Sequence, residues 1–485
     1  MHSNTPSDPS DEQFSDAHEY PPASSPDCND HVYYDIEYPA PVESPNDYCV
    51  GGFHPVHLGD TLGNAGRYRV VHKLGDGGFA TVWLCRDLYE QKWRAVKINA
   101  AAASNPEHSP EFAVSERFAD VTPEALAQQH IALPIEYFWM YGPNGRHLCA
   151  VMPLLGPRVT ELYNWYGNYP ELLKGVCFQI TKGLSYLHQR EICHGDLRPE
   201  NILFQLDDRV DSMSEEELTQ LLGSPKRVKV IASDGAKVAD GVPEYLVPQA
   251  CLNFSSGLCS TKVSITDLGI CYDANDPPLD TGIPTKYAAP EDIFRRSTLG
   301  PATDVWTLGC TIACIATGLM PFGEVSEVHP VMWAMEDLMG PSPQPFRAAW
   351  KEEFKYEYKN DENDESLAVS MPQKNSAIYL KERIESTGFS NKLLASLVKE
   401  NYRLYITHAQ AAEVAKQDYR TIGLLPGFTQ LPGPGEWEDR MDFERDEQDM
   451  KLLFDLLTSI FKWHPEDRVS ADKILDHEWF EVWSE

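Results

Sequence analysis

The pattern of hydrophobic and polar positions predicts two regions of different structure along this chain. Before residue 160, short runs rich in β-branched and aromatic residues predict strands, and a glycine-rich turn joins the first two. The expected elements in chain order are strands at Tyr68–Val71, Thr81–Cys85 and Trp93–Ile98, helices at Glu111–Phe118 and near Glu124–Gln129, and a buried strand at Leu148–Leu154. This region is therefore expected to be small and strand-rich.

The rest of the chain is predicted to be mainly helical. Apolar residues recur at helical spacing over Glu171–Gln189, and Ala302–Thr317 has the composition of a buried helix. Two polar stretches, at about 207–261 and 351–366, interrupt this pattern and do not resemble core segments. Together the two regions predict an α+β fold with insertions in its helical part.

Composition limits the kind of partner that this chain binds. Its 485 residues contain 41 Lys and Arg against 74 Asp and Glu, which gives a net charge of −33. Such acidity disfavours binding to nucleic acid or to anionic lipid and favours a basic partner. The alternative interpretation is that the acidic residues only keep the protein soluble. We expect no direct nucleic-acid binding.

The first residues and the cysteines bear on the environment of the protein. Residues 1–30 are acidic and rich in Ser and Pro, so we expect them to be disordered and to form neither a signal peptide nor a membrane anchor. The 11 cysteines are scattered without a CxxC pair, which indicates reduced thiols and argues against structural zinc.

The glycine-rich turn is the first candidate for chemistry. It has the sequence Gly75-Asp76-Gly77-Gly78-Phe79-Ala80-Thr81-Val82 and lies between two predicted strands. The missing side chains allow backbone N–H groups to approach phosphate oxygens closely. Taken alone, such a turn is more often only a hairpin connection.

A lysine on the next strand changes that balance. Lys97 follows Ala95 on the strand after the turn, where its ammonium group can reach nucleotide phosphates. Glu111 has the helical phase expected of a residue that pairs with Lys97, and Glu116 is the alternative.

The most specific motif is His194-Gly195-Asp196-Leu197-Arg198-Pro199-Glu200-Asn201. Phosphoryl transfer needs a carboxylate that accepts the substrate hydroxyl proton and an amide that binds magnesium, and Asp196 and Asn201 have the required spacing. Asp267, after a β-branched strand, is the expected second metal ligand.

Further downstream, Ala289-Pro290-Glu291 and Asp304-Val305-Trp306 follow in order, and Arg468 is expected to form a salt bridge with Glu291. In this order the motifs resemble the protein kinase superfamily over about 67–480. The resemblance implies a bilobal fold, with a small β-rich N-lobe, a large mainly helical C-lobe, and ATP and Mg²⁺ in the cleft. It also implies that Met152 borders the adenine, with Pro153 and Leu155 as hinge residues.

One segment narrows the resemblance to a family. A segment typical of SR-protein kinases is similar to residues 47–60 of this chain, Asp47-Tyr48-Cys49-Val50-Gly51-Gly52-Phe53-His54-Pro55-Val56-His57-Leu58-Gly59-Asp60. The glycine-rich turn also resembles the turn of that family. The long interval between Asn201 and Asp267 matches the family's spacer. The resemblance implies Ser/Thr kinase activity on basic Arg/Ser-rich proteins, a role in mRNA splicing regulation, a monomer, and a cytoplasmic and nuclear location.

The resemblance also gives expected domain boundaries. These are a disordered N-terminus at 1–30, a family-type extension at 31–66, an N-lobe at 67–155, and a C-lobe at 156–482 that carries the two insertions.

Five positions depart from the usual kinase pattern. Gly195 stands where many kinases have Arg, so we expect no dependence on activation-loop phosphorylation. Arg198 replaces the usual Lys, Pro284 replaces a Thr that bridges to it, Leu268 replaces Phe, and Ala80 replaces Gly. The changes at Arg198 and Pro284 predict altered substrate positioning and a low rate. Together with Leu268 they leave a pseudokinase scaffold that binds a basic partner as one alternative, and an active kinase of other specificity in the same wider group is the second.

Overall fold

The computed structural model describes residues 32–106, 109–160, 170–250, 258–295, 297–317, 320–323, 328–357 and 447–483. It divides into two compact units. Of the described residues, those up to 127, in 132–156 and in 205–260 form the first unit, and those in 128–131, in 157–204 and from 261 onward form the second. The expected disorder of residues 1–30 lies outside the described residues.

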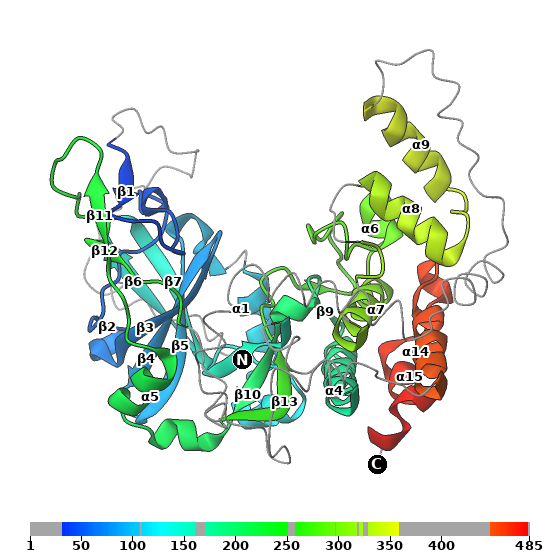
Figure 1. The fold of residues 1–485 in the computed structure, drawn as a ribbon, viewed down its shortest axis with the longest axis horizontal. Helices are drawn as coiled ribbons and strands as arrows, with labels where there is room; N and C mark the ends of the chain where they lie inside the picture. Colours follow the sequence, from blue (N-terminus) through cyan, green and yellow to red (C-terminus); the bar gives the residue numbers. More distant parts are fainter. Residues whose placement is uncertain are drawn as a thin grey trace, which may run out of the picture. The chain divides into compact units, whose positions relative to one another are not determined.

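The first unit is built on a six-stranded antiparallel sheet in the order β2-β3-β4-β5-β7-β6 (Figure 1). Its strands are β2 (Thr61–Leu62), β3 (Tyr68–Gly77), β4 (Ala80–Asp87), β5 (Lys92–Asn99), β6 (Glu136–Gly142) and β7 (Gly145–Pro153). Helices α1 (Pro110–Arg117) and α2 (Pro123–Gln128) lie between β5 and β6 in the sequence. Each strand and helix expected before residue 160 is therefore confirmed, within a few residues at its ends.

Residues from both ends of this unit's sequence cover the sheet. On one face, Val70, Trp83 and Val96 pack with Val56, which precedes the sheet, and with Val247, which comes from the first polar stretch. Burying these side chains removes apolar surface from water and is the main source of stability for the sheet.

The first polar stretch is ordered and belongs to the first unit. It forms the helix α5 (Glu215–Leu222) and the strands β11 (Val228–Ala232) and β12 (Tyr245–Leu246). Strand β1 (Tyr34–Ile36) pairs antiparallel with β11, which pairs with β12. From the sequence we expect this stretch to be an insertion in the helical lobe. In the structure it belongs to the strand-rich unit instead.

The second unit is mainly helical, which confirms the α+β class (Figure 1). Helices α4, α7, α14 and α15 pack together there. The helices are α4 (Pro170–His188), α6 (Pro290–Phe294), α7 (Pro301–Thr317), α8 (Val328–Met339), α9 (Phe346–Glu357), α14 (Glu447–Ile460) and α15 (Ala471–Leu475), and the short strands are β9 (Ile192–Cys193) and β14 (Tyr272–Asp273).

Strands β8 (Leu155–Arg158), β10 (Ile202–Leu206) and β13 (Cys259–Ile265) form a sheet in the order β13-β10-β8. Each of these strands contains a point where the chain passes from one unit to the other.

The two long helices form where the apolar periodicity predicted them. Along α4, Val176, Ile180, Leu184 and Leu187 are fully buried. On α7, Trp306 is also fully buried, and its ring stacks on Phe322 with 5.0 Å between centroids. These contacts form the helical core that supports the segments around Asp196.

The second polar stretch is described only in part. Residues 351–357 continue helix α9, and the remainder of 351–366 lies outside the described residues. Within the described residues, no helix is long and apolar enough to cross a membrane. Every cysteine that the structure describes is a free thiol.

Candidate active site

The glycine-rich turn closes the hairpin of β3 and β4. Gly77 pairs with Ala80, so Gly78 and Phe79 form the turn, and the Phe79 side chain is 76% exposed. A Cβ atom at Gly77 or Gly78 would meet none of the described atoms within 4 Å. Packing within the protein therefore does not demand glycine here, and the turn is open to a ligand.

Four predicted nucleotide-binding side chains share one face of the sheet. Val82 lies opposite Lys97, Leu84 lies opposite Ala95, and Ala95 lies opposite Met152. Because alternate residues of a strand point to the same face, Val82, Ala95, Lys97 and Met152 lie on a common face.

Lys97 is fixed by an ion pair. Its Nζ atom lies 3.0 Å from Oε2 of Glu111, which is buried on α1. Ser109 caps this helix by accepting a hydrogen bond from the Phe112 N–H, and so sets where Glu111 lies. Glu116, the alternative partner, is exposed.

The predicted hinge residues lie where the chain leaves the first unit. Pro153 ends β7, Leu155 begins β8, and the chain enters the second unit again at Pro157. Their contact with a base stays a prediction.

In the second unit, Asp304 of α7 anchors the segment that precedes Asp196. Its carboxylate accepts hydrogen bonds from the backbone N–H of His194 at 2.6 Å and of Gly195 at 2.9 Å. Gly195 has a φ of +78°, and a Cβ there would lie 2.7 Å from the carbonyl oxygen of Ile270. The backbone geometry therefore requires glycine at 195.

His194 links this segment to the strand before Asp267. Its Nδ1 accepts the Asp196 N–H at 3.1 Å, so Nε2 carries the proton and donates to the Thr266 carbonyl at 3.1 Å. These roles of His194 and Asp304 were not predicted from the sequence, although both residues lie in recognisable motifs.

The Asp196 carboxylate is buried and only partly satisfied. Its Oδ2 accepts hydrogen bonds from Asn201 Nδ2 at 2.8 Å and from Arg198 Nε at 3.1 Å. Its Oδ1 lies 3.0 Å from Arg198 Nε, yet it accepts no hydrogen bond from any described residue. One carboxylate oxygen is thus left for a further donor.

Arg198 remains charged in this position. Burial acts to lower its pKa, but the neighbouring groups, with Asp196 first among them and Glu200 next, together outweigh that effect and raise the pKa above its ordinary value. Its Nη1 also lies 3.8 Å from Glu200. The guanidinium therefore supplies a permanent positive charge next to Asp196.

The two predicted metal ligands lie on neighbouring segments. Thr266 donates to the Asn201 carbonyl from its N–H at 2.9 Å and from its hydroxyl at 3.0 Å, and Asp267 comes next. Asp267 has a φ of +60°, which is unusual for a residue with a side chain and is often retained at functional sites. Leu268 is fully buried.

The predicted salt bridge between Glu291 and Arg468 is confirmed. Two hydrogen bonds of 2.6 and 2.7 Å join these fully buried side chains. Such a bidentate pair holds α6 to the segment before α15 and has a structural role.

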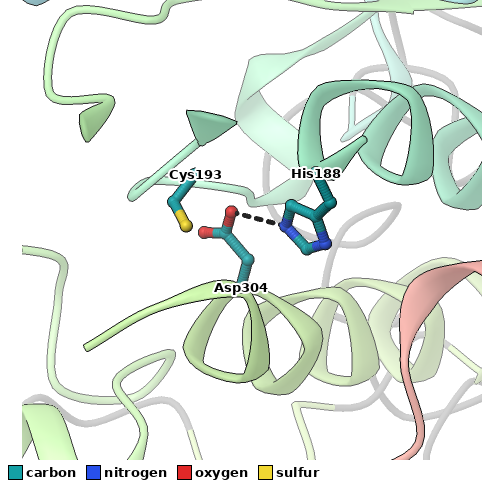
Figure 2. A group of neighbouring side chains, drawn as sticks. All are labelled: His188, Cys193 and Asp304. Carbon is teal, nitrogen blue, oxygen red and sulfur yellow. Dashed lines mark hydrogen bonds and ion pairs between the residues drawn. The ribbon is translucent and has the colours of Figure 1, made fainter. Parts of the chain in front are cut away.

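Figure 2 shows His188, Cys193 and Asp304, the group of three metal-ligating residue types found among the described residues. His188 Nε2 lies 3.0 Å from Asp304, whose carboxylate already accepts two backbone N–H groups. Burial and the nearby Asp304 raise the pKa of the Cys193 thiol, which stays protonated. The hydrogen bonds of Asp304 therefore explain why these three residues lie together: they anchor the segment before Asp196.

Comparison with known proteins assigns this chain to a family. The model described as "Protein kinase domain" matches residues 68–213 and 255–480, more than half of the chain. A solved structure titled as a kinase domain is 20% identical over 88% of this chain and 98% of its own length, with a TM-score of 0.47.

Among curated proteins, similar chains are named as protein kinases, and several of these names contain SRSF or SRPK. SRSF protein kinase 3 of Homo sapiens is 37% identical over 39% of this chain and 35% of its own length. Protein kinase dsk1 of Schizosaccharomyces pombe is 34% identical over 38% of this chain and 34% of its own length. Serine/threonine-protein kinase SRPK of Physarum polycephalum is 28% identical over 65% of this chain and 76% of its own length. The chain spans about a third of the length of the first relatives that it matches.

Proposed function

This chain belongs to the protein kinase family, as its match to the protein kinase domain model shows, and we propose that it is an active kinase that phosphorylates serine or threonine in proteins. The observation that carries the proposal is the state of the buried Asp196 carboxylate. Asn201 and Arg198 donate to its Oδ2, whereas its Oδ1 lies 3.0 Å from Arg198 Nε and accepts no hydrogen bond from any residue that the structure describes. A pseudokinase has no need to keep such a group.

The unsatisfied oxygen fits the acceptor of a substrate hydroxyl proton. A serine hydroxyl that donates to Asp196 Oδ1 would be oriented for attack on phosphorus. Arg198, fixed beside the carboxylate, places a positive charge where negative charge develops during phosphoryl transfer.

Asn201 and Asp267 fit a magnesium site by their donor atoms. The Asn201 Nδ2 group donates to Asp196, which turns its carbonyl oxygen away and leaves that oxygen available to a hard cation. Asp267 adds a carboxylate. A bound Mg²⁺ would neutralise charge on the transferred phosphate.

In the first unit, the open glycine-rich turn and Lys97 supply a site for phosphates. The turn offers backbone N–H groups, and the ion pair with Glu111 holds the Lys97 ammonium on the same face as Val82 and Ala95. These side chains would bind ATP at its phosphates and at the base.

For the substrate, we propose serines in Arg-rich segments of proteins. The charge of −33 favours a basic substrate, and the names of the SRSF and SRPK relatives point the same way. The monomeric state and the cytoplasmic and nuclear location stay predictions.

A comparison of wild type with Asp196→Asn tests the proposal. Wild type should transfer phosphate from MgATP to an Arg-Ser peptide, and Asp196→Asn should reduce kcat by about 10²-fold or more. MgATP should raise the melting temperature of both proteins, because Asp196 is not required for nucleotide binding. Absence of transfer by wild type would leave the pseudokinase alternative.

A further inference from the structure

Lys73, just before the glycine-rich turn, is a fully buried cation with two anionic partners. Its Nζ atom forms an ion pair with Glu43 and lies 2.9 Å from Oδ1 of Asp76 in the turn. Tyr48 donates its hydroxyl hydrogen to the other Glu43 oxygen. Glu43 is also buried, whereas the Asp76 side chain is 32% exposed. A buried lysine of this kind needs both the charge and the hydrogen bonds of its partners.

An irregularity in β3 makes this arrangement possible. Residues three apart in a regular strand point to opposite faces, but the register shifts between Lys73 and Gly75. Lys73 lies opposite Trp83, and Asp76 lies opposite Thr81. Since Trp83 and Thr81 are two apart on β4, Lys73 and Asp76 share a face.

That face is the one away from Lys97. Asp76 pairs with Thr81, whereas Lys97 pairs with Val82, the next residue of β4. Consecutive strand residues point to opposite faces, so the Asp76 carboxylate is directed away from the face that carries Lys97.

The backbone of Lys73 is held from a second direction. Its carbonyl accepts a hydrogen bond of 2.8 Å from the N–H of Ala250, at the end of the first polar stretch. The segment before the sheet, through Glu43, and the polar stretch, through Ala250, therefore meet at the residue that fixes Asp76.

We propose that Lys73 and Glu43 are positioning residues for nucleotide binding, which hold the Asp76 carboxylate on the face opposite Lys97 and away from the ATP phosphates. The inference rests on the proposed function, because it needs phosphates at the turn. A free carboxylate between Gly75 and Gly77 would repel those phosphates. The ion pair with Lys73 keeps that carboxylate away from the phosphates. It acts by position and not by neutralisation, because Glu43 and Asp76 share the one cation.

The test uses a variant that keeps the buried pair neutral. Glu43→Gln with Lys73→Gln removes both buried charges together, so no unpaired charge is left in the interior, and Asp76 loses its partner. The triple variant adds Asp76→Asn, which removes the repelling charge. Arg69→Gln with Glu215→Gln is the matched control, because it removes another ion pair that joins β3 to the polar stretch.

We expect the double variant to raise KM for ATP about tenfold while kcat changes less than twofold, since the repulsion acts on phosphate binding. The triple variant should restore KM to within twofold of wild type. The affinity for adenosine, measured by calorimetry, should be the same in all variants, because adenosine carries no phosphate. The control pair should leave KM unchanged.

An unchanged KM in the double variant, or a triple variant with KM as high as that of the double, would overturn the inference. Equal weakening of adenosine and ATP would do the same, since it would indicate a general loss of structure. If wild type neither transfers phosphate nor binds MgATP, the proposed function itself fails. If wild type is active and the variants have the same KM for ATP, only the inference about Lys73 and Glu43 fails.

Discussion

At the residue scale, substitutions of Arg198 test whether catalysis depends on the charge or on the shape of the side chain beside Asp196. The guanidinium lies 3.0 Å from the carboxylate, in a position where the motif usually has lysine. Arg198→Gln should lower kcat about 10²-fold, because it removes a positive charge from the reacting centre. Arg198→Lys keeps the charge and should lose at most about tenfold.

Steady-state kinetics on one Arg-Ser peptide would separate these cases, with KM for ATP as the internal control. If the lysine and glutamine variants were equally slow, the planar geometry of Arg198 would matter and its charge would not.

Gly195 gives a prediction about stability. The backbone at 195 has a φ of +78°, and an added Cβ would lie 2.7 Å from the Ile270 carbonyl oxygen. Gly195→Ala should lower the free energy of unfolding by about 1–3 kcal/mol, measured by urea denaturation.

Gly282→Ala is the matched control for that measurement. Gly282 has a φ of +73° with none of the described atoms within 4 Å of an added Cβ, so it isolates the cost of the dihedral angle. The Gly195 variant should lose more stability than the Gly282 variant, and equal losses would contradict the role of the close approach to Ile270.

At the scale of elements, regular segments could be predicted from the sequence, and the first polar stretch could not. Strands β3, β4 and β5 carry β-branched and aromatic residues at positions that a sheet buries, so local pattern was sufficient. The polar stretch has a high content of charge and glycine, which masked two local signals. Ser214 and Glu217 form a capping box, and the sequence of β11 alternates buried and exposed residues.

The sequence did not allow us to predict to which unit that stretch belongs. Its position depends on long-range contacts, such as the pairing of β1 with β11, and no local pattern reveals a partner almost 200 residues away. The same holds for the ion pairs of Lys73, because a charged residue in a strand gives no sign of burial.

Helix α5 provides a test that the stretch contributes to stability. Leu218 on α5 is buried in a cluster with Leu84 and Trp93 of the sheet. Leu218→Ala should cost about 2–5 kcal/mol of unfolding free energy, and Ser214→Ala about 1 kcal/mol through loss of the cap. Glu216→Ala, at an exposed position of the same helix, is the control and should change stability by less than about 0.5 kcal/mol. Equal values for all three would mean that α5 does not support the sheet.

At the scale of the whole molecule, the order of motifs carried the family assignment. Lys97 and Glu111 lie in one unit, and Asp196, Asn201 and Asp267 lie in the other. The sequence identified these residues because their types and spacing are dictated by phosphoryl transfer. It did not reveal the hydrogen bonds from Asp304, since those depend on how α7 packs in the second unit.

The net charge leads to the prediction about substrate. With 74 acidic against 41 basic residues, we expect the protein to attract a basic peptide at long range, and salt to screen this attraction. Arg-Ser, Pro-directed and acidic peptides should be compared as substrates at about 50 and about 500 mM NaCl, where the screening length falls roughly threefold. The Arg-Ser peptide should have the highest kcat/KM at low salt and lose most of that advantage at high salt. If acidity served only solubility, salt would affect the three peptides alike, and equal rates on all three would refute the assignment of an Arg-Ser substrate.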